Sequence, residues 1–139
     1  MKKFNQWNEI KKMLNDNSPR IVAKEGYLYW VSVGVNVGTE EDGKGPVFTR
    51  PVLAYYADDN NKKEFLGIPF TTTPQRNEKY TEIAMVEDEI TYALLKQIRV
   101  FSVKRINREI GRLKPEIFDN IIYKMTRIRP RRYYKTRKK

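Results

Sequence analysis

Short segments rich in β-branched and aromatic residues fill the middle of the chain, separated by turn-forming residues. Glycine, proline, asparagine and aspartate mark the breaks, which is typical of short strands joined by turns. The expected strands cover residues 27–33, 48–56, 64–71, 80–85 and 90–102, the last as one long strand or two short ones. Five or more such strands predict a small, strongly bent β-sheet or barrel. A barrel closes its edges and exposes its loops, so we expect function on the loops 34–48 and 72–79.

Helical spacing of apolar residues flanks this β-rich region on both sides. Residues 3–15 predict a short amphipathic helix, and Pro115 opens a second helix at the position that proline prefers. A brief helical turn is expected at 104–108. The apolar residues that carry the two helical patterns are Phe4, Trp7, Ile10, Met13 and Leu14 in the first helix, and Phe118, Ile121, Ile122 and Met125 in the second. The sequence therefore predicts a mainly β fold with an added N-terminal helix and a C-terminal helix.

The positive charge lies at the two ends of the chain. The net charge is +11, yet residues 25–123 hold thirteen basic and fifteen acidic residues. Residues 124–139 hold nine basic residues and no acidic one, and residues 1–24 hold six basic and two acidic residues. This distribution indicates a near-neutral domain with basic extensions rather than a uniformly basic nucleic-acid-binding domain.

The absence of two residue types narrows the possible chemistry. The 139 residues include no histidine and no cysteine, so an active site has to use arginine, threonine, glutamate, tyrosine, glutamine or backbone groups. We expect no metal and no cofactor, because no metal-binding cluster is visible. No apolar run has the length of a membrane helix, and no signal-type stretch follows the lysine-rich start. We expect a cytoplasmic protein that does not associate with membranes.

Four blocks of sequence, in order, resemble the PemK/MazF-like toxins of bacterial type II toxin–antitoxin systems. The blocks are GYLYWV at 26–31, GTE at 38–40 with RPVL at 50–53, IPFTT at 68–72, and LLKQIR at 94–99. The resemblance implies a small SH3-like β-barrel of the CcdB/PemK type, a homodimer, and metal-independent cleavage of single-stranded RNA at short sequences. It also implies an antitoxin protein whose disordered tail fills the RNA groove. We divide the chain into an N-terminal helix and linker (1–24), a toxin barrel domain (25–126) and a basic tail (127–139).

The resemblance also selects the catalytic residues. It implies that Arg50, before the proline, and Thr71, the first threonine of its block, form the catalytic pair. A guanidinium matches phosphate oxygens in two-point geometry, and its proton is held too firmly for acid–base work, so Arg50 is expected to stabilise charge in the transition state. Thr71 is expected to hold a phosphate oxygen or to orient Arg50. Glu40 is the candidate for accepting the 2′-hydroxyl proton or for aligning Arg50.

Seven further residues are candidates for RNA contact. Basic segments with interspersed tyrosines bind RNA through phosphate charge with occasional stacking, which favours the tail as a contact region. The candidates are Thr39, Lys44, Thr72, Gln97, Arg131, Arg132 and Lys135. The aromatic residues of the first expected strand, Tyr27, Tyr29 and Trp30, are interpreted as core or dimer contacts.

Two alternatives stay open at the level of sequence. The same barrel could be a non-catalytic RNA-binding module whose affinity lies in the basic ends. It could also be a related toxin barrel that acts on a protein such as DNA gyrase, although the RP and IPFTT blocks weigh against this.

Overall fold

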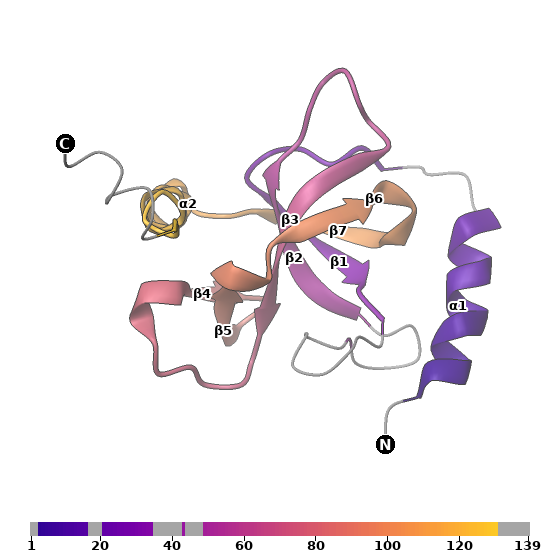
Figure 1. The fold of residues 1–139 in the computed structure, drawn as a ribbon, viewed down its shortest axis with the longest axis horizontal. Helices are drawn as coiled ribbons and strands as arrows, with labels where there is room; N and C mark the ends of the chain where they lie inside the picture. Colours follow the sequence, from indigo (N-terminus) through magenta and orange to yellow (C-terminus); the bar gives the residue numbers. More distant parts are fainter. Residues whose placement is uncertain (1–2, 17–20, 35–42, 44–48, 131–139) are drawn as a thin grey trace.

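Seven antiparallel strands form one curled sheet in the computed structural model, with a helix at each end of the fold (Figure 1). The structure describes residues 3–16, 21–34, 43 and 49–130. The strands are β1 (Tyr27–Ser32), β2 (Thr49–Tyr56), β3 (Glu64–Thr71), β4 (Thr81–Val86), β5 (Glu89–Leu94), β6 (Arg99–Ser102) and β7 (Ile106–Arg112). The helices are α1 (Phe4–Asp16) and α2 (Pro115–Met125), and the 3₁₀ turns are η1 (Glu78–Tyr80), η2 (Leu95–Gln97) and η3 (Val103–Arg105). The predicted mainly β class with two flanking helices is confirmed.

The strands follow the order β4-β5-β3-β2-β1-β7, and β6 also pairs with β3. The β-rich region 90–102 therefore forms two short strands, β5 and β6, with η2 between them. The helical turn predicted over 104–108 is wrong beyond Arg105, because β7 begins at Ile106 and pairs with β1. Pairing with a neighbouring strand outweighs a weak local preference, which is why the short pattern misled the prediction.

A proline in the middle of β3 marks the place where this strand changes partner. Residues 64–67 pair with β6, and residues 70–71 pair with β5. Pro69 lies between these two ladders, where its missing N–H costs no hydrogen bond to either partner. The sheet consequently curls at this point and brings the end of β3 beside the β4–β5 hairpin.

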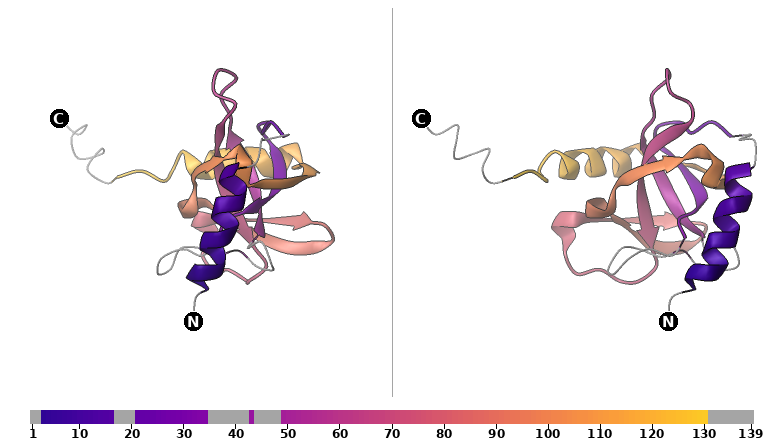
Figure 2. Two further views of the ribbon diagram at one scale, coloured as in Figure 1. Left: turned by 90° about the vertical axis from the view of Figure 1, so that its right-hand side faces the viewer. Right: turned by 45° about the vertical axis from the view of Figure 1, so that its right-hand side comes forward.

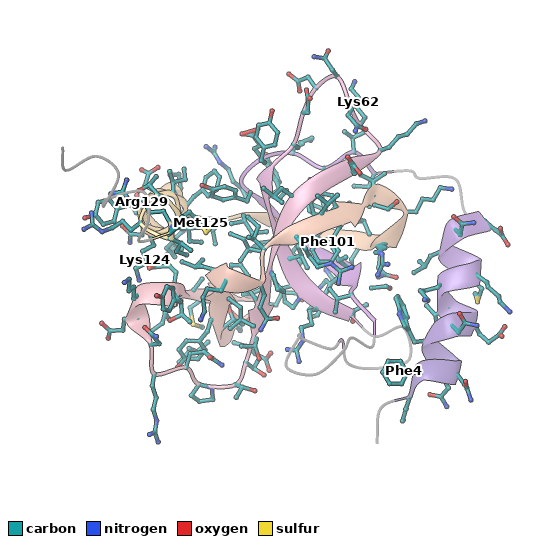
Figure 3. The ribbon with its side chains drawn as sticks, viewed as in Figure 1. Phe4, Lys62, Phe101, Lys124, Met125 and Arg129 are labelled. Atoms are coloured by element: carbon teal, nitrogen blue, oxygen red, sulfur yellow. The ribbon has the colours of Figure 1, made fainter. Side chains whose placement is uncertain are left out.

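Two apolar clusters fill the two sides of the sheet. One lies under α2 and includes Phe70 and Ile121, both completely buried. The other surrounds Phe101, which Figure 3 shows at the centre of the sheet. Here a Cβ on Gly67 would lie 2.6 Å from a methyl of Val52 and 2.7 Å from the Phe101 ring, so only glycine permits this packing. Each fully buried large side chain contributes about 1.5–3 kcal/mol.

Helix α1 stands on the opposite side of the sheet from α2 (Figures 1 and 2). Its anchor is Trp7, which is 4% exposed and packs with Ile10 and Leu14. The indole fills the space over Gly34, where a Cβ would lie only 2.0 Å from the ring. Phe4 and Met13 belong to the predicted apolar pattern but are exposed. Within the described residues, no helix combines the length and apolar character that crossing a membrane requires.

Candidate active site

Arg50 and Thr71 lie opposite each other on adjacent strands. The ladder between β2 and β3 pairs Val52 with Pro69, and the same register continued by two residues brings Arg50 opposite Thr71. Arg50 Nη1 donates a hydrogen bond of 3.2 Å to Thr71 Oγ1. Arg50 is 8% exposed and Thr71 is 2% exposed. The strand register thus holds a guanidinium and a hydroxyl in contact at a largely buried position.

The Thr71 hydroxyl accepts two hydrogen bonds. The second donor is the backbone N–H of Thr73, at 3.2 Å. A hydroxyl has two acceptor lone pairs and one proton. Since both lone pairs are engaged, what Thr71 can offer a ligand is its proton, which has no acceptor within the described part of the chain. Such a group suits an acceptor-only ligand such as a phosphate oxygen.

Arg50 and Thr71 line a cavity of about 520 Å³. Strands β1, β2 and β3 form one part of its wall, and the β4–β5 hairpin forms another. The hairpin contributes two carboxylates, from Glu87 and Glu89. The cavity therefore combines an arginine with two acidic side chains, an arrangement that can both stabilise negative charge and accept a proton.

Glu87 is held at the rim of this cavity by two donors. Trp30 Nε1 donates to its carboxylate at 2.8 Å, and Arg108 Nη2 lies 2.9 Å from both carboxylate oxygens. The hydrogen bond from Arg108, followed by that from Trp30, lowers the pKa of Glu87. Glu87 and Asp88 form the turn between β4 and β5 with φ of 48° and 65°, a left-handed conformation that costs non-glycine residues about 1–2 kcal/mol each. These contacts compensate for part of that strain and fix the turn at the cavity.

The predicted site residues fall into three groups. Arg50 and Thr71 are in contact, and Thr72 is exposed on the lining of the same cavity. Gln97 is half-buried in η2 and does not belong to this lining. The remaining candidates lie outside the described residues: Thr39, Glu40, Lys44, Arg131, Arg132 and Lys135.

Trp30, Glu87 and Glu89 line the cavity but were not among the predicted site residues. Trp30 was interpreted as a core or dimer contact, but it is half-buried and lines the cavity, whereas its neighbour Tyr29 is completely buried in the core. Alternation along a strand sends adjacent side chains to opposite faces, and this was the available signal. Nothing in the sequence points to Glu87 and Glu89, because it does not reveal that β3 ends beside this hairpin.

Comparison with known protein families gives a match over most of the chain. The family model described as PemK-like, MazF-like toxin of type II toxin–antitoxin system matches residues 24–128. This range includes the whole sheet, the cavity and α2, and it leaves α1 outside. No curated protein matches the chain. Within the described residues, no three histidine, cysteine, aspartate or glutamate side chains are grouped in a way that could hold a metal ion.

Proposed function

The chain belongs to the PemK-like, MazF-like toxins of type II toxin–antitoxin systems, and we propose that it is an endoribonuclease that cuts single-stranded RNA in the cytoplasm. Membership of this family implies an antitoxin protein as a partner. The observation that carries the proposed activity is the hydrogen bond between Arg50 and Thr71 on the wall of an open cavity. The proposed reaction needs no metal and no cofactor, because every group it uses belongs to the chain or to the RNA.

The proposed reaction is a transesterification within the RNA. The ribose 2′-hydroxyl loses its proton to a base, its oxygen attacks the adjacent phosphorus and the bond to the 5′-oxygen breaks. The leaving 5′-oxygen takes up a proton from the protonated base or from water, and the products are a 2′,3′-cyclic phosphate and a 5′-hydroxyl. Negative charge builds on the non-bridging oxygens in the transition state. Arg50 stabilises that charge, and the Thr71 hydroxyl donates a hydrogen bond to one phosphate oxygen while its lone pair accepts the hydrogen bond from Arg50.

We propose that a carboxylate accepts the proton of the attacking 2′-hydroxyl, since the chain has no histidine to do so. Glu40 is the candidate selected by sequence. Glu89 is a second candidate, because it lines the cavity and makes no hydrogen bond or ion pair within the described part of the chain. Glu87 is less suited to this role, as Trp30 and Arg108 already engage its carboxylate.

Other residues are proposed to hold the RNA on either side of the reacting phosphate. Thr72 is the best placed of them, since it is exposed beside Thr71 on the cavity wall. Thr39, Lys44, Gln97 and the tail residues Arg131, Arg132 and Lys135 remain candidates from the sequence. The division of the chain at residues 24 and 126 also remains a prediction.

We further propose that two copies associate through the β4–β5 hairpin. Met85 lies opposite Ile90 on this hairpin, and they are 60% and 58% exposed. Ile83, two residues before Met85 on the same face, is 57% exposed. β4 is an edge strand of the sheet, and an apolar face on an edge strand invites a partner. The occupant expected from the family resemblance is a second copy of the chain.

The test of the proposed activity compares wild type with Arg50→Ala in expressing cells and in vitro. Removing one preorganised donor typically costs about 100- to 1000-fold in rate, so Arg50→Ala should abolish growth arrest and RNA cleavage while leaving a folded protein. Arg112→Ala is a matched control, because Arg112 is exposed on β7 and does not line the cavity. Full toxicity of Arg50→Ala would refute the assignment. RNA binding by the wild type without cleavage would favour a binding module, and growth arrest with intact RNA would favour a protein target.

A further inference from the structure

A second hollow, of about 390 Å³, separates α1 from the turn η3. It lies outside the cavity that holds Arg50, and none of its lining residues belongs to that cavity. We refer to this hollow as the α1–η3 groove. One wall is formed by the second half of α1 and the other by η3 and the end of β6, so the groove exists only because α1 is present.

The charged side chains that line the α1–η3 groove are all basic. They are Lys11 and Lys12 from α1, and Lys104 and Arg105 from η3. No carboxylate is among the described residues of its lining, although Glu9 pairs with Lys12 on the exposed surface of α1. Four cations around one hollow repel one another, and an anionic ligand would relieve that repulsion.

The groove is preformed rather than loosely covered by a helix. Lys104 Nζ donates to the carbonyl oxygen of Asn15 at 2.7 Å and so ties η3 to the last turn of α1. Arg105 donates to the carbonyl oxygen of Ser32 at 3.2 Å, and its guanidinium lies 5.3 Å from the centre of a Trp7 ring. Burial, together with the nearby charge of Arg99, lowers the pKa of Arg105. The arginine is therefore fixed in a position that disfavours its own positive charge.

A further arginine, Arg99 of β6, lies near the η3 side of the groove. In the ladder between β3 and β6, Arg99 lies opposite Gly67. Arg99 stacks on Phe101, with its guanidinium 4.6 Å from the ring centre, and lies close enough to Arg105 to repel it. Arg99 therefore adds to the positive potential at the η3 side of the groove.

We propose that the α1–η3 groove binds phosphate groups of the RNA backbone at a distance from the cleaved bond. This proposal rests on the proposed function, because RNA is the polyanion that the proposed reaction brings to the protein and the charged lining of the groove is entirely basic. A single RNA strand carries one charge at each nucleotide, so a strand long enough to leave the cavity carries further phosphates that the groove could bind. Helix α1 lies outside the matched family range, which makes the groove an addition of this chain to the barrel.

The test measures binding of the full chain to labelled 2′-O-methyl RNA of mixed sequence, which lacks the attacking hydroxyl and stays intact. The variant is Lys11→Gln with Lys12→Gln, which removes two exposed charges and retains good helix-forming residues. The matched control is Lys62→Gln with Lys114→Gln, two exposed lysines outside the groove; Figure 3 shows Lys62 on the turn between β2 and β3. Binding is compared for a strand of about 20 nucleotides and one of about six, across a range of salt concentrations.

The groove variant should bind the long strand more weakly than wild type does. The slope of the logarithm of the binding constant against the logarithm of salt concentration should be less steep. The expected change is about 0.7 for each phosphate that the variant no longer neutralises, or about 1.4 for both lysines. Binding of the short strand should be unchanged, and the control should match wild type for both strands.

Equal salt slopes for the groove variant and the control would overturn the proposal. Binding of a glutamate-rich peptide is measured as well. If the groove variant loses this peptide while it still binds the long RNA as wild type does, the proposal is overturned and the groove is assigned to an acidic protein. Cleavage of unmodified RNA by the wild type, measured in parallel, reports separately on the proposed function.

Discussion

Replacing Thr71 by valine tests whether its hydroxyl holds Arg50 in a productive position. Valine has nearly the same shape, so the substitution removes the acceptor of the 3.2 Å bond from Arg50 and the 3.2 Å bond from Thr73 N–H without opening a cavity. A hydrogen bond to a charged group contributes about 1.5–3 kcal/mol. If the hydrogen bond stabilises the transition state by this full amount, its loss lowers the rate roughly 10- to 100-fold, since about 1.4 kcal/mol corresponds to a factor of ten.

The assay is single-turnover cleavage of a labelled RNA, with thermal unfolding recorded for each variant. Thr71→Ser keeps the hydroxyl and should remain within a few-fold of the wild-type rate. Thr72→Val changes the exposed neighbour on the same cavity wall and should affect rate less than Thr71→Val does. A wild-type rate for Thr71→Val, or an equal loss in Thr72→Val, would refute the assigned role of the hydroxyl.

Three further predictions concern the turn, the helix and the hairpin face. The pKa of Glu87 is lowered, chiefly by the hydrogen bond from Arg108, so its stabilising effect is complete above the unfolded-state pKa and is lost as the pH falls through the folded-state pKa. Glu87→Gln should therefore melt below wild type at neutral pH, with a difference that disappears in acid; a constant difference would contradict this. Gly34→Ala should cost at least about 1–2 kcal/mol in thermal unfolding, because φ is +83° and the new Cβ would lie 2.0 Å from Trp7, and an unchanged melting temperature would rule out this packing. Met85→Lys should shift the sedimentation of the protein from dimer to monomer, and a wild type that sediments as a monomer would remove the proposed interface.

Most elements of the fold could be predicted from local pattern. The strands before residue 95 and both helices appear close to their expected bounds, because their signals are local: β-branched runs, turn residues and helical spacing. The region 103–112 was the exception. Its residues 107–109 are all exposed, so β7 shows no apolar alternation, and its pairing with β1 depends on the rest of the sheet.

The candidate site was only partly predictable, for a related reason. Arg50 and Thr71 were chosen by resemblance, and what brings them together is a strand register that neither segment encodes alone. Glu87 and Trp30 are 57 positions apart in sequence, and their contact depends on the change of partner at Pro69. The attachment of α1 through Trp7 and Gly34 was likewise invisible, because the pattern predicts a helix and an apolar face without saying what that face covers.

The chemical identity of the RNA ends tests the central claim most directly. Purified wild-type protein is incubated with single-stranded RNA in excess EDTA, and the new ends are analysed by mass spectrometry and by their reactivity towards a 5′-kinase. Transesterification at Arg50 and Thr71 predicts cleavage that survives EDTA and yields 2′,3′-cyclic phosphate and 5′-hydroxyl ends, with Arg50→Ala leaving the RNA intact. Ends that carry a 5′-phosphate, or cleavage that stops in EDTA, would contradict the account.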